Sequence, residues 1–177
     1  MKANLKKNAF LKFLIYSGLT YLILYLIHQF LVKRYTLYDQ KFIGSIIIST
    51  KSILNLFNYK TFISIQPNDY QVIGIDGSNG VWVGSNCNAI SLFILFVVFI
   101  IWYPGVQKPK LWFIPFGIIS IHVLNIIRII ALTLIAYYSP RSLNFNHTYT
   151  FTFLVYAYIF MLWIWWVNKF ANAKLTP

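Results

Sequence analysis

The sequence predicts an all-α integral membrane protein: a multi-pass helical bundle of about four transmembrane helices, with an interfacial helix and a small outer-face hairpin. Two features of its composition predict this class. Of the 177 residues, 59% are hydrophobic and only 10% are charged, whereas an average soluble domain carries about 25% charged residues. Fifteen Lys and Arg face three acids, which gives a formal net charge of +12. Because most of these basic residues lie at the ends of apolar runs, we exclude a soluble enzyme and a soluble nucleic-acid-binding protein.

Four apolar runs are the predicted spans, since about 20 apolar residues cross a bilayer as a helix. They cover residues 10–32, 89–103, 111–138 and 149–167. The first run exceeds the ~7–15 residues of a signal peptide's apolar region, and no small-x-small cleavage site follows it, so we interpret it as an uncleaved anchor. The second run is short, but it ends in Trp102 and Tyr103, residues that favour the membrane interface.

The segment between the first two spans is more polar. Residues 42–57 contain interspersed Ser, Lys and Asn, which favours a helix that lies on the membrane surface or dips into it. A strand-like stretch at 70–76, turn residues at 77–80 and a short apolar return at 81–83 then predict a hairpin. This hairpin is either a passive cap, or a lid or edge to which an extended peptide adds as a strand. The single membrane domain thus divides into anchor and interfacial helices (1–57), an outer-face loop with the hairpin (58–86) and a three-helix core (87–177).

The basic residues also predict how the chain is oriented. With both termini cytoplasmic, four spans place eight basic residues inside: Lys2, Lys6, Lys7, Lys12, Lys108, Lys110, Lys169 and Lys174. The outer side then has six, spread over a much longer loop: Lys33, Arg34, Lys41, Lys51, Lys60 and Arg141. Because basic residues in short segments favour the cytoplasmic side, this distribution supports cytoplasmic termini.

Arg128 lies inside the third apolar run, where inserting a charge at the bilayer centre costs at least ~2.5–3.5 kcal/mol. At 1.5 Å per residue it lies about 25 Å from Leu111, near the outer boundary of the membrane. Asn125 precedes it by three positions and therefore shares its face of the helix. Either Arg128 extends outward to lipid phosphate, or it belongs to a functional site.

Cys87 is the only cysteine, which excludes an intrachain disulfide. A lone cysteine is commonly a small buried hydrophobic residue. Here Asn86 and Asn88 flank it and an apolar run follows at once, so we expect Cys87 to open a helix whose N-terminus stabilises the thiolate.

His147 precedes the last apolar run by two residues and is either a solvated loop residue or part of a site. Under the predicted topology, Cys87, Arg128 and His147 all reach the outer boundary of the membrane. Nucleophilic catalysis requires a thiolate, an acid/base group and a donor that stabilises the oxyanion, and these three side chains can supply them. No spacing of His, Cys and Asp indicates a metal site, and we expect no cofactor.

With these residues identified, the chain resembles the exosortase/archaeosortase family of membrane cysteine transpeptidases, and most of all the short exosortase F branch of Bacteroidetes-type bacteria. The resemblance rests on Asn-Cys-Asn-Ala-Ile at 86–90, Leu-Asn-Ile-Ile-Arg-Ile at 124–129 and Asn-His at 146–147. Many members have Ser-Gly or Ala-Gly after the cysteine, where this chain has Asn88-Ala89. By resemblance, Cys87 is the nucleophile and Arg128 and His147 complete the catalytic site, with Asn86, Asn88 and Asn125 as supporting residues.

The resemblance implies an enzyme of the bacterial inner membrane with its active site on the periplasmic face. Its substrates would be secreted proteins that end in a sorting motif, a transmembrane helix and a basic cluster. The enzyme would cleave near the motif, hold the chain as a thioester on Cys87 and pass it to an acceptor nucleophile that the sequence does not identify. Two alternatives remain open: a non-enzymatic membrane subunit of an export or surface-assembly system, and a membrane cysteine protease without transfer.

Overall fold

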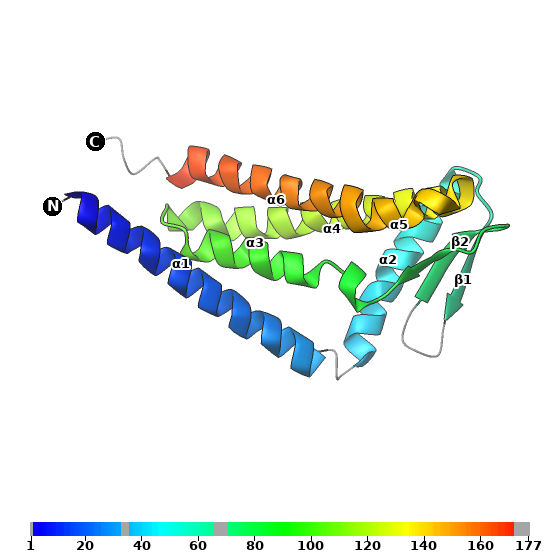
Figure 1. Cartoon of the computed structure of the whole chain (residues 1–177), viewed down its shortest axis with the longest axis horizontal. Helices are drawn as coiled ribbons and strands as arrows, with labels where there is room; N and C mark the ends of the chain where they lie inside the picture. Colours follow the sequence, from blue (N-terminus) through cyan, green and yellow to red (C-terminus); the bar gives the residue numbers. More distant parts are fainter. Residues whose placement is uncertain (1, 33–35, 66–70, 172–177) are drawn as a thin grey trace.

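The computed structural model describes residues 2–32, 36–65 and 71–171, and it consists of long helices with one small sheet at one end (Figure 1). The α-helices are α1 (Lys2–Ile27), α2 (Thr36–Leu56), α3 (Ile90–Trp102), α4 (Gln107–Tyr138), α5 (Leu143–Phe145) and α6 (Phe151–Trp166). The strands are β1 (Thr61–Ile65), β2 (Gln71–Ile75) and β3 (Val81–Val83). Shorter helical turns join or extend these elements: η1 (His28–Val32), η2 (Ser85–Cys87), η3 (Pro140–Ser142), η4 (Asn146–Thr150) and η5 (Val167–Ala171).

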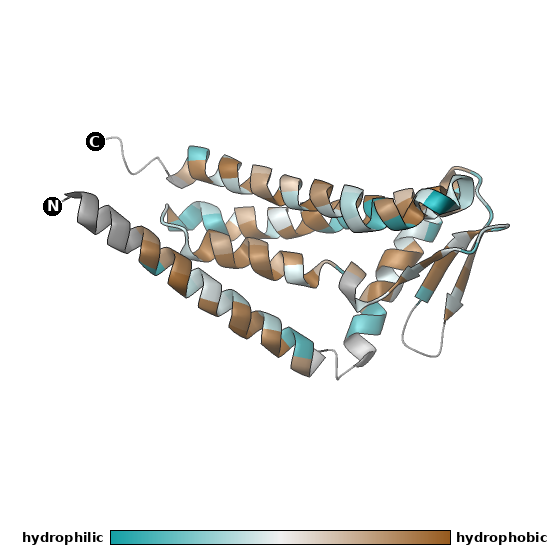
Figure 2. Ribbon diagram, in the orientation of Figure 1, coloured by the Kyte–Doolittle hydropathy of each residue, from teal (hydrophilic) through white to brown (hydrophobic). Residues whose placement is uncertain are grey.

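Apolar residues predominate along the long helices (Figure 2), and many of their large side chains are exposed, as expected for a protein that faces lipid. Among the described residues, three helices are long and apolar enough to cross a membrane: Phe10–Phe30, Gln107–Tyr138 and Pro140–Phe170. Helix α3 has only 13 residues and is about 20 Å long. This is shorter than the roughly 30 Å hydrocarbon core of a bilayer. The structure therefore supports a helical membrane protein, while the predicted fourth span stays a prediction.

Helix α1 contacts the rest of the bundle through aromatic side chains. The ring of Tyr16 stacks on Trp102 of α3 with 5.2 Å between centroids, and Phe13 packs edge-on against Phe99. The indole Nε1–H of Trp102 also donates to Thr20 Oγ1 at 3.0 Å. Ring pairs of this kind stabilise by about 0.5–1.5 kcal/mol beyond the area they bury, so they hold α1 to the end of α3.

Helices α3, α4 and α6 enclose one apolar core. Its largest fully buried members are Phe96, Ile100, Phe113, Ile121 and Trp166. Gly117 allows α3 and α4 to approach closely, because a Cβ there would lie 2.1 Å from the Phe96 ring. These contacts fix how far α4 is shifted along its axis relative to α3, and so which residues of α4 lie beside the segment before α3.

The predicted hairpin is confirmed as strands β2 and β3, which pair antiparallel with Ile73 opposite Val81. Gly77 and Gly80 of the connecting turn have φ values of 87° and 70°, a region that glycine adopts without steric cost. The expectation of a hairpin alone is wrong, because β1 pairs with the other edge of β2 to give a three-stranded sheet in the order β1-β2-β3. Strand β1 is easily missed because it is only partly buried and leaves Ile65 exposed.

Helix α2 begins at Thr36, six residues before the predicted interfacial helix at 42–57, and crosses the end of the bundle beside the sheet (Figure 1). Ile43, Ile46 and Ile47 are fully buried in a cluster with residues of the sheet and α4. This spacing places one apolar face of α2 against the protein. The helix is therefore part of the packed structure, and its position relative to the membrane surface stays a prediction.

Candidate active site

Cys87 lies between the sheet and α3, at the end of the turn η2. Its backbone N–H donates to Gly84 O at 2.8 Å, and its side chain is only 7% exposed, within an aliphatic cluster that includes Val83 and Ile129. The expectation that Cys87 opens a helix is wrong in detail, because α3 begins three residues later at Ile90. The turn is needed because the chain must leave β3 and change direction before it enters α3.

His147 lies directly beside this thiol. Cys87 Sγ and His147 Nε2 are 3.7 Å apart, although the residues are separated by 60 positions in the chain. His147 belongs to the helical turn η4 that joins α5 to α6, so the expectation of a loop residue is wrong. The helical turn gives the imidazole a defined position, which a solvated loop would not.

Arg128 reaches the same site from α4. The side chain is half-buried, and its charge is close enough to His147 to act on it electrostatically. Its Nε is buried and has no hydrogen-bond partner among the residues that the structure describes. The buried Nε shows that part of the Arg128 side chain packs within the protein, and whether its guanidinium serves the site or extends to lipid phosphate stays a prediction.

Asn125 lies one turn before Arg128 and fixes the backbone of the cysteine. The side chain is buried, and its Nδ2 donates to the carbonyl oxygen of Cys87 at 2.8 Å. The Oδ1 of the same side chain is buried without a partner in the described part of the chain. Because a buried unsatisfied acceptor costs about 1–3 kcal/mol, this oxygen is suited to accept a hydrogen bond from a bound molecule.

Asn88 connects the segment after the cysteine to helix α2. It is 1% exposed; its Nδ2 donates to Asp39 Oδ1, and its Oδ1 accepts from the backbone N–H of Ile90 at 3.0 Å. Asp39 is itself 5% exposed and lies in the first turn of α2, where a carboxylate is favoured by the helix dipole. Asn88 therefore links α2 to the first residue of α3, next to Cys87 in the chain.

Sequence reasoning missed Asp39 as a residue of this site. Its only signal was rarity, because it is one of three acids in the chain. Its partner Asn88 lies 49 positions away, and no sequence pattern joins the two.

Ala89 is the N-cap of α3 and has the left-handed backbone conformation, with φ 62° and ψ 6°. Its carbonyl oxygen accepts from the N–H groups of Leu92 and Phe93, each at 3.0 Å. A residue other than glycine pays roughly 1–2 kcal/mol for this conformation. The segment between Cys87 and α3 is therefore a strained turn held by hydrogen bonds on both sides.

The remaining supporting residue, Asn86, has its backbone in η2, and its side chain lies outside the part of the chain that the structure describes. Among the described residues, no group of three or more His, Cys or acidic side chains gathers in a way that could hold a metal ion.

Comparison with protein-family models, curated proteins and solved structures finds no match for the chain. The function proposed below therefore depends on the geometry of the site and on the sequence resemblance.

Proposed function

We propose that the protein is a membrane-embedded cysteine transpeptidase or protease that removes a C-terminal sorting tail from secreted proteins. The observation that carries this proposal is the 3.7 Å approach of Cys87 Sγ to His147 Nε2, with Arg128 acting on the same imidazole. A nucleophile and a base within reach of each other, with a third group that orients or polarises them, are the signature of covalent catalysis.

The proposed reaction gives each of these groups a role. His147 takes the thiol proton, and the sulfur of Cys87 forms a bond to the carbonyl carbon of the scissile peptide. Arg128 stabilises the negative charge that develops on the carbonyl oxygen. The C–N bond then breaks as His147 returns the proton to the leaving amine, which leaves a thioester. An acceptor amine or water gives a proton to His147 and displaces the thiolate.

The proposal includes a topology in which the site lies on the periplasmic face of a bacterial inner membrane. The start of α1 and the end of α6 lie at one end of the molecule, and the sheet lies at the other (Figure 1). The predicted cytoplasmic termini would thus put the sheet, Cys87 and His147 outside. In this arrangement α3 is a short fourth transmembrane span, and residues 85–89 cover the part of the membrane thickness that α3 does not reach.

Because Cys87 is nearly buried, a substrate must displace some of the side chains around it. Strand β3 is at an edge of the sheet and ends four residues before the cysteine. A substrate in extended conformation that adds to this edge would run toward Cys87, which favours the lid-or-edge interpretation of the hairpin. The free Oδ1 of Asn125 would then accept a hydrogen bond from its backbone.

The proposal is tested by expressing the full chain with candidate tail-bearing secreted proteins and following tail removal by mass. We expect Cys87→Ala to leave these proteins unprocessed while the variant still inserts in the membrane. Normal processing by Cys87→Ala would exclude the proposed enzyme. The mass of the wild-type product shows how the thioester is resolved. A product that has gained only water indicates a protease, and one that carries a larger added group indicates transfer to an acceptor.

The burial of Cys87 among aliphatic side chains favours a second candidate, a non-enzymatic membrane subunit of an export or surface-assembly system. In that case the thiol only fills space. Cys87→Ala would then preserve the cellular phenotype, whereas a bulky replacement such as Cys87→Phe would abolish it through misfolding.

The topology has its own test, because Cys87 is the only cysteine. In a Cys87→Ala background, Asn79→Cys places a thiol in the exposed turn between β2 and β3, and Lys108→Cys places one at the exposed start of α4. A membrane-impermeant maleimide applied to spheroplasts should label Asn79→Cys, and label Lys108→Cys only after lysis. The reverse pattern would invert the proposed orientation.

A further inference from the structure

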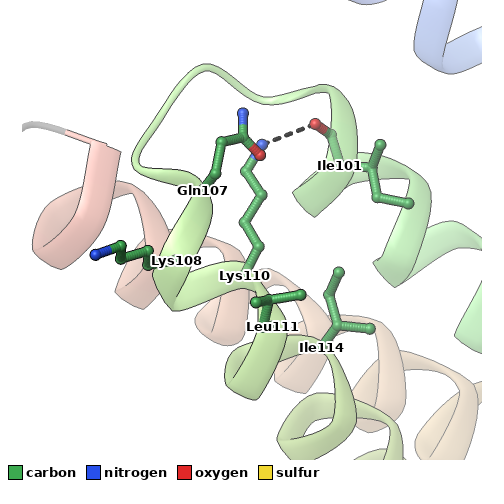
Figure 3. A pocket seen from close by; sticks show the side chains of 6 residues that line it. All are labelled: Ile101, Gln107, Lys108, Lys110, Leu111 and Ile114. Carbon is green, nitrogen blue, oxygen red and sulfur yellow. Dashed lines mark hydrogen bonds between the residues drawn. The ribbon is translucent and has the colours of Figure 1, made fainter.

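The end of the molecule opposite Cys87 contains a pocket at the connection between α3 and α4. Its volume is about 340 Å³, and it is lined by Ile101, Gln107, Lys108, Lys110, Leu111 and Ile114 (Figure 3). This volume lies at the lower end of the range of about 300–1,000 Å³ that is usual for ligand sites.

Lys110 is the unusual residue of this pocket, because it is only 5% exposed. Its ammonium donates to the carbonyl oxygens of Ile101 at 2.8 Å and Tyr103 at 3.0 Å (Figure 3 shows the first of these bonds). These carbonyls lie at the C-terminal end of α3, where positive charge is favoured. The sequence predicts Lys110 only as one of the basic residues of the cytoplasmic side and gives no sign that its side chain is buried.

The charge of Lys110 lacks a carboxylate partner in the described structure. The chain has three acids. Asp39 is bound to Asn88 and Asp76 follows β2, so both lie at the sheet end, and Asp69 lies outside the described residues. Backbone carbonyls supply partial charge only, and a buried cation is normally paired with an anion. The pocket therefore presents a cation that an incoming anion would neutralise.

The pocket changes from polar to apolar along the axis of α4. The first turn of α4 contributes the polar residues Gln107, Lys108 and Lys110, with the Gln107 amide beside the Lys110 ammonium (Figure 3). Leu111 and Ile114 follow, and Ile101 of α3 lies across from them. Ile114 is about 10 Å further along the helix than Gln107. A phospholipid has the same order, because its charged phosphate lies at the interface and its acyl chain extends toward the bilayer centre.

We infer that this pocket binds the phosphate of an anionic phospholipid, with the first part of an acyl chain along Leu111, Ile114 and Ile101. Basic pockets between transmembrane helices bind anionic head groups in this way. Binding here would neutralise Lys110 and hold the ends of α3 and α4 together. The inference does not depend on the chemistry of Cys87, which lies at the other end of the bundle.

The test uses the purified full chain in a neutral detergent and measures lipid binding by native mass spectrometry. We expect phosphatidylglycerol to bind at least about ten-fold more tightly than phosphatidylcholine, since a charge-assisted hydrogen bond contributes more than the neutral contacts alone. Lys110→Gln should weaken phosphatidylglycerol binding by about ten-fold or more. Ile101→Trp fills the apolar side of the pocket without changing its charge or its backbone carbonyl, and should also weaken binding.

Lys169→Gln is the matched control, because Lys169 lies in η5 at the same end of the molecule, with its ammonium over the Trp165 and Phe170 rings. It should leave lipid binding unchanged. If it weakens binding as much as Lys110→Gln, the attraction is general electrostatics and the proposed site is wrong. Displacement of the lipid by millimolar inorganic phosphate would show a free-phosphate site and overturn the lipid assignment. If Lys110→Gln does not fold, unchanged binding by Ile101→Trp alone overturns the inference.

Discussion

The two ends of helix α4 bury polar side chains in different ways. At its start, Lys110 donates to carbonyl oxygens only seven and nine positions earlier in the chain, in the connection it helps to close. Toward its other end, Asn125 reaches the backbone of Cys87, 38 positions away, and Arg128 acts on His147. The first arrangement forms as soon as α3 and α4 pack together. The second exists only when α2, the sheet, α3, α4 and η4 are all in place.

This difference in burial bears on the function proposed for each end of the helix. Lys110 stabilises the fold by donating to nearby carbonyl oxygens at the end of α3, although these carbonyls do not neutralise its charge. The sheet end instead gathers Cys87, His147, Arg128 and a buried carboxylate. Desolvation of these polar groups costs free energy, and apolar residues would fill the same space at a lower cost. This contrast is in keeping with the two proposals, which put chemistry at the sheet end and lipid binding at the other. The variants below test this division, beginning with the largest expected effect.

His147→Ala should produce the largest loss of tail removal after the cysteine variants. An acid/base side chain contributes about 10²–10⁴-fold to the rate, and the imidazole is only half-buried, so stability should change little. The rate is measured by pulse-chase of a tail-bearing substrate, and folding by thermal unfolding in detergent. Asn144→Ala, an exposed residue of α5, is the matched control. Equal rates for His147→Ala and this control would remove His147 from the mechanism.

Arg128→Gln should reduce the rate about 10²–10³-fold, the range observed when a donor to an oxyanion is removed. Arg141→Gln removes the same charge from an exposed position in η3 and should leave the rate within about two-fold of wild type. The same pulse-chase assay compares the two. A similar loss in both variants would mean that Arg128 acts only through the net charge of this surface.

Asp39→Ala should destabilise the protein by about 1–3 kcal/mol, because it leaves the buried Nδ2 of Asn88 without an acceptor. It should also slow tail removal, since Asn88 holds the segment after Cys87. Asp39→Asn retains an acceptor and should restore most of the rate. Lys110→Gln is the comparison at the other end: it should lower the unfolding temperature but preserve the rate. If Asp39→Ala lowers stability with an unchanged rate, Asp39 has no positioning role.

Ala89→Gly should have the smallest effect, a stabilisation of up to about 1 kcal/mol. Glycine removes the cost of the left-handed conformation, and its greater freedom in the unfolded chain offsets part of this gain. Thermal unfolding measures the change. Ala131→Gly, in the interior of α4, should instead destabilise by about 1 kcal/mol. Destabilisation by both substitutions would show that the turn before α3 does not carry the strain assigned to it.

The sequence predicted most of the long elements, because the apolar runs at 10–32, 111–138 and 149–167 are continuous and their helices follow from hydrophobicity summed over neighbours. It also predicted the β2–β3 turn, where glycines with positive φ are a local requirement. It missed β1 because that strand is stabilised by pairing with β2, and its own burial pattern is weak. It misplaced the start of α2 because residues 36–41 mix polar and apolar types, and one face of the helix is covered only in the folded protein.

The features of the candidate site also separate into those that the sequence predicted and those that only the structure showed. The sequence by itself determined that the chain is rich in apolar helices, and it supplied one cysteine, a charge inside an apolar run and a histidine before the last helix. Only the tertiary structure decided that the thiol meets the imidazole, that Asn88 is held by Asp39, and that Lys110 is buried. Hydrophobicity and turn preference are properties of a few adjacent residues. Contacts between residues tens of positions apart depend on how whole helices pack, and the packing is a property of the complete chain.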